Sequence, residues 1–171
     1  ATYTGSQTAV GISKNTFAYT LKSGTRAENY AFTKVEGDLE VTAADISTGS
    51  EADWQITFGP ALTYTGLEQI QTLASVTYKG LPLDYSVTGN AQTDAGNYTM
   101  TLTGQGNFTG MRDVAWAIAP KALSLAAGSG SRMYDGTAFT VGMVTAVGFA
   151  PGEGAEYECA GSQADVGSSQ N

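Results

Sequence analysis

The stretch NYTMTLTGQGNFTGMRDVAWAIAP, residues 97–120, determines the fold class of this chain. Polar and apolar residues alternate in both halves of the stretch, and the apolar positions are Tyr98, Met100, Leu102, Val114, Trp116 and Ile118. A spacing of two places such residues on one face of a β-strand. Pro120 ends the second run because proline cannot donate a hydrogen bond to a sheet ladder. The stretch therefore predicts two half-buried strands.

The same alternation recurs in residues 17–21, 54–58 and 72–87. In the last of these, TLASVTYKGLPLDYSV, two alternating arms flank Lys79-Gly80, and this pattern predicts a β-hairpin that turns near these two residues. No stretch has a convincing helical spacing of 3.6 residues. We therefore predict an all-β protein. We expect the core of its middle region to contain Trp54, Val76, Tyr98, Leu102, Trp116 and Ile118.

The composition excludes several classes of protein. The 171 residues are 42% hydrophobic and 14% charged, which permits a buried core. A formal net charge of −8 opposes binding to nucleic acid, because affinity for phosphates needs clustered Lys and Arg. No apolar run approaches the ~18 residues that a membrane helix needs, so we expect no membrane contact by these residues. With one Cys and no His, neither an internal disulfide nor a Cys/His zinc site is possible.

Internal repeats organise the chain. GSQTAVGISKN (5–15) and GSQADVGSSQN (161–171) share seven of eleven residues. TYTG around Gly66 is similarly related to MYDG around Gly136. In a second pair of similar segments, Leu102 and Trp116 align with Leu21 and Val41. A period of roughly 75 to 80 residues indicates strung domains rather than one large core. We expect residues 1–45 to be the closing half of one repeat, 46–120 a complete repeat and 121–171 the opening half of a third.

Three segments carry a resemblance to a known family. They are SRMYDGTAFT with GFAPGEGAEYECAGSQADVGSSQN, NTFAYTLKSGTRAENYAFTKVEGDLEVT, and DAGNYTMTLTGQGNFTG with VAWAIAPKAL. These segments resemble the mostly-β, glycine-rich repeats called MBG domains, which occur in large bacterial surface proteins. The resemblance implies tandem small antiparallel Ig-like β-sandwich repeats on extracellular stalks and adhesins. It implies no catalytic residues.

Catalytic and metal chemistry have little support in the sequence. Cys159 lacks a His partner and is interpreted as a small strand residue. Acidic residues cluster in VEGDLE (35–40), EAD (51–53) and GEGAEYE (152–158), and we interpret them as solvated loop charges. A calcium site between repeats is the alternative, since hard cations bind several loop oxygens. No D-x-D-x-D-G loop is present, so we predict no enzyme activity, no metal and no cofactor.

Two further groups of residues allow a structural and a functional interpretation. Trp54 and Trp116 alternate with other apolar residues and therefore predict core packing rather than a platform for stacking sugars. Exposed Tyr side chains on one sheet would bind glycan, and the candidates are Tyr64, Tyr78, Tyr85 and Tyr98. Lys34 lies on an expected strand, but no residue is marked as its partner in an isopeptide crosslink.

The function that we expect is a stiff, non-catalytic spacer on the bacterial cell surface, in contact with neighbouring repeats of its own array. The alternative is an adhesive module that grips host or matrix glycan or protein through Tyr residues and loops. Half a sandwich exposes unpaired strand edges. We therefore also expect head-to-tail association, in which residues 121–171 of one molecule complete residues 1–45 of the next.

Overall fold

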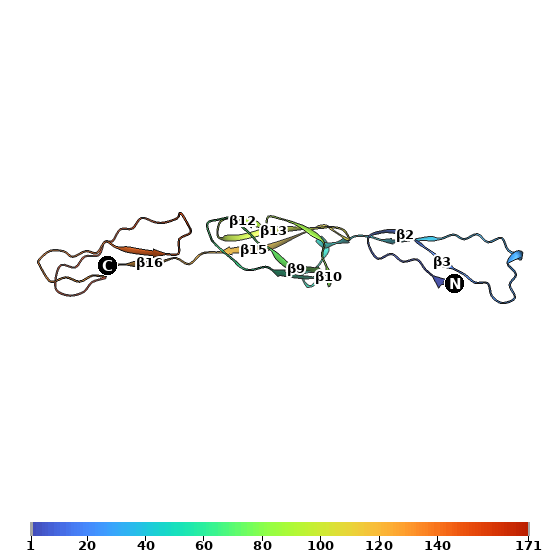
Figure 1. The fold of residues 1–171 in the computed structure, drawn as a ribbon, viewed down its shortest axis with the longest axis horizontal. Helices are drawn as coiled ribbons and strands as arrows, with labels where there is room; N and C mark the ends of the chain where they lie inside the picture. Colours follow the sequence, from blue (N-terminus) through green and yellow to red (C-terminus); the bar gives the residue numbers. More distant parts are fainter. Residues whose placement is uncertain (1, 171) are drawn as a thin grey trace. The chain divides into compact units, whose positions relative to one another are not determined.

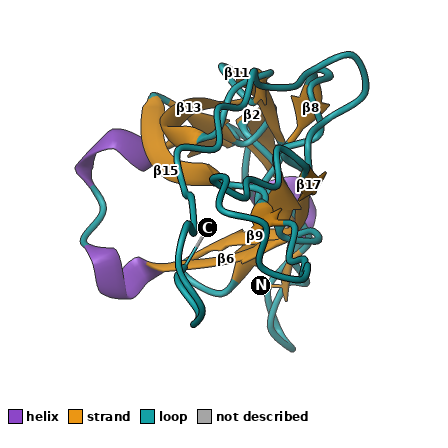
Figure 2. Ribbon diagram, turned by 90° about the vertical axis from the view of Figure 1, so that its left-hand side faces the viewer, coloured by secondary structure: helices purple, strands orange, loops and turns teal. Residues whose placement is uncertain are grey.

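A computed structural model describes residues 2–170 of the chain. Strands dominate this part, and its helical elements are three 3-10 helices: η1 (Ala27–Asn29), η2 (Ile46–Thr48) and η3 (Glu51–Asp53). Strands and connecting loops make up nearly all of the ribbon in Figure 2. The expectation of an all-β chain is therefore confirmed.

Seventeen strands are present among the described residues. They are β1 (Thr2–Tyr3), β2 (Gly11–Asn15), β3 (Phe17–Ala18), β4 (Gly37–Val41), β5 (Ala44–Asp45), β6 (Trp54–Phe58), β7 (Leu62–Thr63), β8 (Gln69–Ile70), β9 (Leu73–Tyr78), β10 (Leu81–Pro82), β11 (Tyr85–Thr88), β12 (Ala91–Gln92), β13 (Gly96–Gly104), β14 (Phe108–Thr109), β15 (Met111–Ala119), β16 (Ser124–Ala127) and β17 (Val144–Val147).

The chain divides into two compact units, and residues of the long strands β13 and β15 fall in both of them. The first unit comprises residues 2–58, 73–88 and 100–114, and holds the pairs β1-β3, β2-β4 and β14-β5 and the sheet β10-β9-β6. The second comprises residues 59–72, 89–99 and 115–170, and holds the pairs β12-β8 and β16-β17. A four-stranded sheet has the order β11-β13-β15-β7, and its long strands β13 and β15 are labelled in Figure 1.

The two long strands follow the alternation that the sequence predicts. Along β13, Met100 and Leu102 are buried, whereas the intervening threonines are more exposed. Along β15, Val114, Trp116 and Ile118 are buried and their neighbours are exposed or half-buried. Of the six predicted core residues, Tyr98 is only half-buried. The other five, Trp54, Val76, Leu102, Trp116 and Ile118, are buried as expected.

The predicted hairpin turns at Lys79-Gly80, as expected. Leu81 lies opposite Tyr78, so Lys79 and Gly80 form the whole loop between β9 and β10. Lys79 has φ 51° and Gly80 has φ 77°, and two successive positive φ angles are the signature of a type I′ turn. This turn matches the right-handed twist of the flanking strands, which explains why so short a loop closes the hairpin.

Two pairings depart from the expectation of a purely antiparallel sandwich. β14 pairs parallel with β5, with Phe108 opposite Ala44, and β15 pairs parallel with β7, with Ile118 opposite Leu62. The partners are far apart in the chain. A parallel pair needs a long crossover between its strands and therefore leaves no short turn signal in the sequence.

Each unit has its own buried side chains. In the first, the ring of Tyr78 lies 5.0 Å from that of Trp54 and 6.5 Å from that of Phe108, measured between centroids. In the second, Trp116 packs against the half-buried ring of Tyr98 at 5.1 Å and its Nε1 donates to the carbonyl oxygen of Gly89 at 3.1 Å. Aromatic pairs at these distances add stabilisation beyond their buried area.

Two aspartates accept hydrogen bonds at the starts of η2 and η3: Asp45 is the N-cap of η2, and Asp53 of η3 bonds back to the N-cap Ser50. The hydroxyl and the amide of Ser47 donate to the carboxylate of Asp45, and these bonds hold the pKa of Asp45 below its usual range. The amide and the hydroxyl of Ser50 donate to Asp53 and lower the pKa of that carboxyl in the same way. Hydrogen bonds to the charged form favour ionisation.

These caps predict a loss of stability in acid. Because the folded-state pKa of each aspartate lies below the ordinary 3.8, the stabilisation is complete above that value and disappears as the pH falls through the folded-state pKa. We expect the melting temperature to decrease once the pH is lower than about 4. Thermal unfolding from pH 7 to pH 2.5 measures it, and the variant Asp45→Asn/Asp53→Asn should have a flatter profile. Equal slopes in the two proteins would contradict this role of the caps.

Candidate functional site

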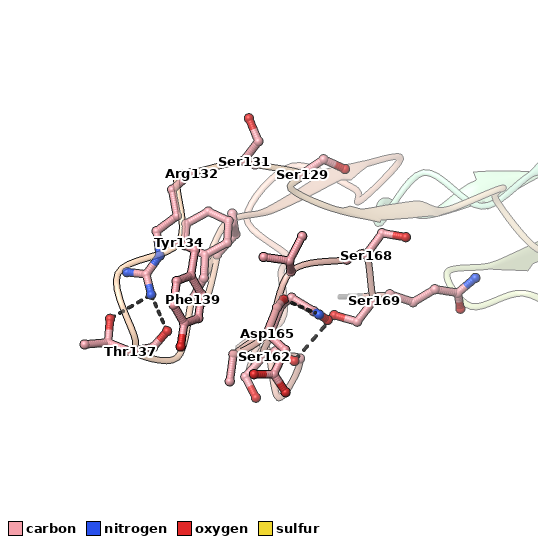
Figure 3. A pocket seen from close by; sticks show the side chains of 18 of the residues that line it. Ser129, Ser131, Arg132, Tyr134, Thr137, Phe139, Ser162, Asp165, Ser168 and Ser169 are labelled. Atoms are coloured by element: carbon pink, nitrogen blue, oxygen red, sulfur yellow. Dashed lines mark hydrogen bonds between the residues drawn. The ribbon is translucent and has the colours of Figure 1, made fainter.

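A cavity of about 790 Å³ lies in the second unit, and we call it the C-terminal cavity. Its lining comes from two stretches, 127–141 and 161–170. The stretches meet where Phe139 and Gln163 exchange backbone hydrogen bonds of 2.8 and 3.0 Å. In Figure 3, Arg132, Thr137 and Phe139 lie on one side of the cavity, and Ser162, Asp165 and Ser169 lie on the other.

A charged turn forms the first side of the cavity. The hydroxyl and the amide of Thr137 donate to Asp135 Oδ1 at 2.8 and 2.9 Å, and they hold the pKa of Asp135 below its usual range. Arg132 forms a 3.0 Å ion pair with Asp135, donates to Thr137 and stacks 5.2 Å above the ring of Phe139. Arg132 therefore satisfies its charge within the turn, which leaves the cavity without a free cation at this point.

A serine- and glycine-rich loop forms the second side. Gln163 Nε2 donates to the carbonyl oxygen of Asp165 at 2.8 Å, and Ser169 Oγ donates to that of Ser162 at 3.4 Å (Figure 3). Gly167 has φ 152°. The loop is thus held by its own side chains.

The same loop geometry occurs near the other end of the chain, in the first unit. Gln7 Nε2 donates to the carbonyl oxygen of Ala9 at 2.7 Å, and Ser13 Oγ donates to that of Ser6 at 3.0 Å. Gly11, with φ 137°, has the place of Gly167. Each of these contacts lies 156 residues before its counterpart, which is the offset of the two GSQ segments. Similar sequence therefore gives the same local structure at both ends.

The turn of the cavity also has a counterpart, in residues 62–72 of the second unit. Gly66 has φ 82° and Gly136 has φ 80°, and both follow the second residue of a Tyr-x-Gly motif. Leu67 donates its amide to Thr65 Oγ1 at 3.3 Å, as Thr137 does to Asp135. Gln69 then pairs with Gln92, as Phe139 does with Gln163.

The region around residues 62–72 and 89–92 differs from the C-terminal cavity in one respect. There, Trp116 of β15 is 5% exposed, and its indole lies against Tyr98 and the carbonyl of Gly89. A closing strand thus supplies a large side chain beside the paired loops. The C-terminal stretch has no strand after residue 147 within the described part of the chain, and a cavity is present beside its paired loops.

Burial is distributed unevenly along the chain. Except for Ala150, every buried hydrophobic residue in the described part lies between Ile46 and Ile118. Large apolar side chains are exposed near both ends, among them Tyr3, Ile12, Tyr30, Val35, Leu125, Met133, Met143, Val147 and Val166. Large apolar side chains are also exposed within residues 46–120, but fewer of them, among them Leu67, Leu81 and Met111.

The tryptophans and tyrosines that the sequence singles out do not form an exposed aromatic platform. Trp54, Trp116 and Tyr78 are buried, as the core interpretation predicts for the two tryptophans. Tyr64, Tyr85 and Tyr98 are half-buried. The hydroxyl of Tyr64 donates to the carboxylate of Glu153, and this bond raises the pKa of the phenol.

The other side chains that could react or bind a metal ion lie apart from one another. Cys159 is half-buried, with Sγ 4.0 Å from the carbonyl oxygen of Met143. Lys34 forms a 2.6 Å ion pair with Glu36 and lies over the ring of Phe17. Within residues 2–170, no three acidic or thiol side chains are grouped so that they would hold a metal ion. In the same residues no helix is long and apolar enough to cross a membrane.

Comparison with known proteins finds no matching family model, no similar curated protein and no similar solved structure. The sequence contained one signal for the C-terminal cavity, the repeated GSQ segment, because that segment forms one side of it. The Arg132 and Phe139 stack had no signal in the sequence, since it joins residues seven apart across an irregular turn.

Proposed function

We propose that the chain is a non-catalytic structural segment of a tandem array of small β-sandwich repeats, and that it acts as a spacer in a large bacterial surface protein. One observation carries the proposal: the loop contacts of Gln7 and Ser13 recur at Gln163 and Ser169. Matching loop contacts 156 residues apart are expected where one structural unit recurs along a chain.

The distribution of apolar residues supports the same proposal. A complete repeat at 46–120 accounts for the buried hydrophobic residues between Ile46 and Ile118, and incomplete repeats account for the fifteen of twenty exposed large apolar residues in the described part that lie outside 46–120. Neighbouring repeats in a longer parent would cover those residues. The extracellular, cell-surface location is part of the proposal and rests on the resemblance to MBG domains.

The adhesive alternative has less support. It needs several exposed aromatic side chains on one sheet, whereas Tyr78 is buried and Tyr64, Tyr85 and Tyr98 are half-buried. Binding sites for small ligands are usually concave and carry a few convergent polar groups. In the C-terminal cavity, the main charged groups, Arg132 and Asp135, are paired with each other.

A lengthened chain tests the spacer function. A second copy of residues 46–120, inserted after Pro120, should raise the maximum dimension in small-angle X-ray scattering by about 30 Å and leave the cross-section radius unchanged. The estimate comes from the nine residues of β13 at ~3.3 Å each. An unchanged maximum dimension would contradict a spacer.

The same preparation tests the adhesive alternative. We expect no saturable binding to immobilised glycans or matrix proteins. Saturable binding that is lost in Tyr85→Ala and kept in Tyr134→Ala would instead favour an adhesive module, because Tyr85 is one of the proposed contact residues and Tyr134 is not.

A further inference from the structure

The first strands of the chain pair with the strands that follow them: β1 pairs with β3, and β2 pairs with β4. Tyr3 of β1 lies opposite Phe17, and the amides of Thr4 and Gly5 both donate to the carbonyl oxygen of Thr16. β2 then pairs with β4 from Gly11 opposite Val41 to Asn15 opposite Gly37. Residues 2–15 therefore supply one complete set of backbone partners to the strands that follow them.

Residues 158–170 can supply the same set of partners. They occupy the same repeat positions as residues 2–14, at an offset of 156, and their loop has the same Gln and Ser side-chain bonds. By that offset Cys159 has the place of Tyr3, and Gly167 has the place of Gly11. Residues 2–15 contain β1 and β2, whereas residues 158–170 form no strand of their own and share the loop contacts, so their backbone can pair with the same strands in another copy.

Apolar burial favours the segment from another copy. Within one chain, β3 and β4 already pair with residues 2–15, and the C-terminal cavity is lined by exposed apolar residues such as Met133 and Val166. If residues 158–170 lie on β3 and β4 of a second copy, then residues 16–45 of that copy become the closing strands of the C-terminal stretch. Val41, the sequence counterpart of Trp116, then enters the place that Trp116 fills in the middle repeat.

We propose that the chain assembles by strand exchange: residues 158–170 of one copy replace residues 2–14 on β3 and β4 of a second copy. The expected register places Glu158 opposite Ala18, Cys159 opposite Phe17, and Gly167 opposite Val41. Each copy has one donor end and one acceptor end, so the contact is head-to-tail and continues along a filament. The proposal deepens the proposed array function and rests on its repeat organisation.

A disulfide crosslink tests the register. In the observed β1-β3 pair, the amide of Thr4 bonds to Thr16, so Tyr3 and Phe17 form the pair without backbone hydrogen bonds, whose Cα atoms lie about 4.5 Å apart. Cysteines at such a pair are within disulfide range. We therefore expect the oxidised Phe17→Cys variant to give a ladder of dimers, trimers and longer species joined between Cys159 and position 17.

Ala18→Cys is the matched control, because its thiol is one residue away and faces the other side of the strand. The ladder should be about tenfold weaker in this control, because its thiol does not face Cys159. The wild-type chain has a single thiol and cannot form disulfide-linked species beyond a dimer. Equal ladders from Phe17→Cys and Ala18→Cys, or a disulfide within single chains, would overturn the proposal.

A second pair of variants needs no crosslink. Ala160 has the place of Thr4, so its amide should donate to Thr16 of the second copy, and Ala160→Pro removes this donor. Ala155→Pro is the control, since Ala155 and Ala160 are both exposed and outside strands. Light scattering over a concentration series should show association of the wild type and of Ala155→Pro, weakened about tenfold in Ala160→Pro.

A wild type that stays monomeric across the series overturns the strand exchange. It leaves the spacer function standing if the lengthened chain still grows by one repeat length in X-ray scattering. Conversely, crosslinking without that growth overturns the spacer function and keeps the exchange.

Discussion

Replacing Trp116 by alanine should lower the free energy of unfolding of the chain by about 3–5 kcal/mol. Trp116 is 5% exposed, packs against the ring of Tyr98 and donates its indole N–H to the carbonyl oxygen of Gly89. The substitution leaves a cavity beside Tyr98 and an unsatisfied carbonyl, and each of these carries its own cost. A loss of this size is a large part of the stability of a small domain.

Denaturant unfolding followed by tryptophan fluorescence of Trp54 measures the change. Met133→Ala is the control, because this side chain is 91% exposed, and the control should stay within about 0.5 kcal/mol of the wild type. A loss below 1 kcal/mol for Trp116→Ala would mean that the buried face of β15 is assigned wrongly, since a shift by one residue moves every side chain to the opposite face.

The long strands and the tight turn were predictable because their signals are local. Alternation over nine residues determines which face of β13 and β15 is buried, and Lys79-Gly80 closes a two-residue hairpin from its own backbone angles. The buried positions Leu102 and Trp116 follow directly from this alternation. Such features depend on neighbours within a few residues and are readable from one sequence.

Other features were not predictable because they depend on distant segments. Phe17, Tyr19 and Leu21 alternate, yet β3 spans only Phe17–Ala18 and Tyr19 is exposed. Alternation marks the face that a strand would bury, but burial needs a partner layer. The parallel pairs of β5 and β7 likewise depend on β14 and β15, which lie more than fifty residues further along the chain.

The candidate site was predictable only in outline. The repeated GSQ segments predicted similar local structure near both ends of the chain, and the loops at Gln7 and Gln163 have matching contacts. The cavity itself arises from the Phe139 and Gln163 bridge and from the turn at Asp135. The bridge joins residues 24 positions apart and the turn lies in irregular backbone, so no periodicity in the sequence marks either contact.

The second large effect concerns Leu102 and its sequence counterpart Leu21. Leu102 is fully buried, so Leu102→Ala should cost about 2–5 kcal/mol. Leu21 is only half-buried and lies outside a strand, so the same change there should cost about 1 kcal/mol or less in dilute protein. Chemical denaturation at low protein concentration measures both values. The difference follows from the layer that covers Leu102 and is missing over Leu21.

Protein concentration separates this explanation from a simple difference in local environment. If residues 16–45 close the C-terminal stretch of another copy, Leu21 gains a partner layer in the assembled form, and Leu21→Ala should then weaken assembly as well as stability. The cost of Leu21→Ala should therefore rise with protein concentration, whereas the cost of Leu102→Ala should stay constant. Only Leu21 gains contacts when copies associate, so only its substitution is coupled to association by mass action. A cost for Leu21→Ala that is independent of concentration, or equal to that of Leu102→Ala in dilute protein, would contradict incomplete repeats at the ends of the chain.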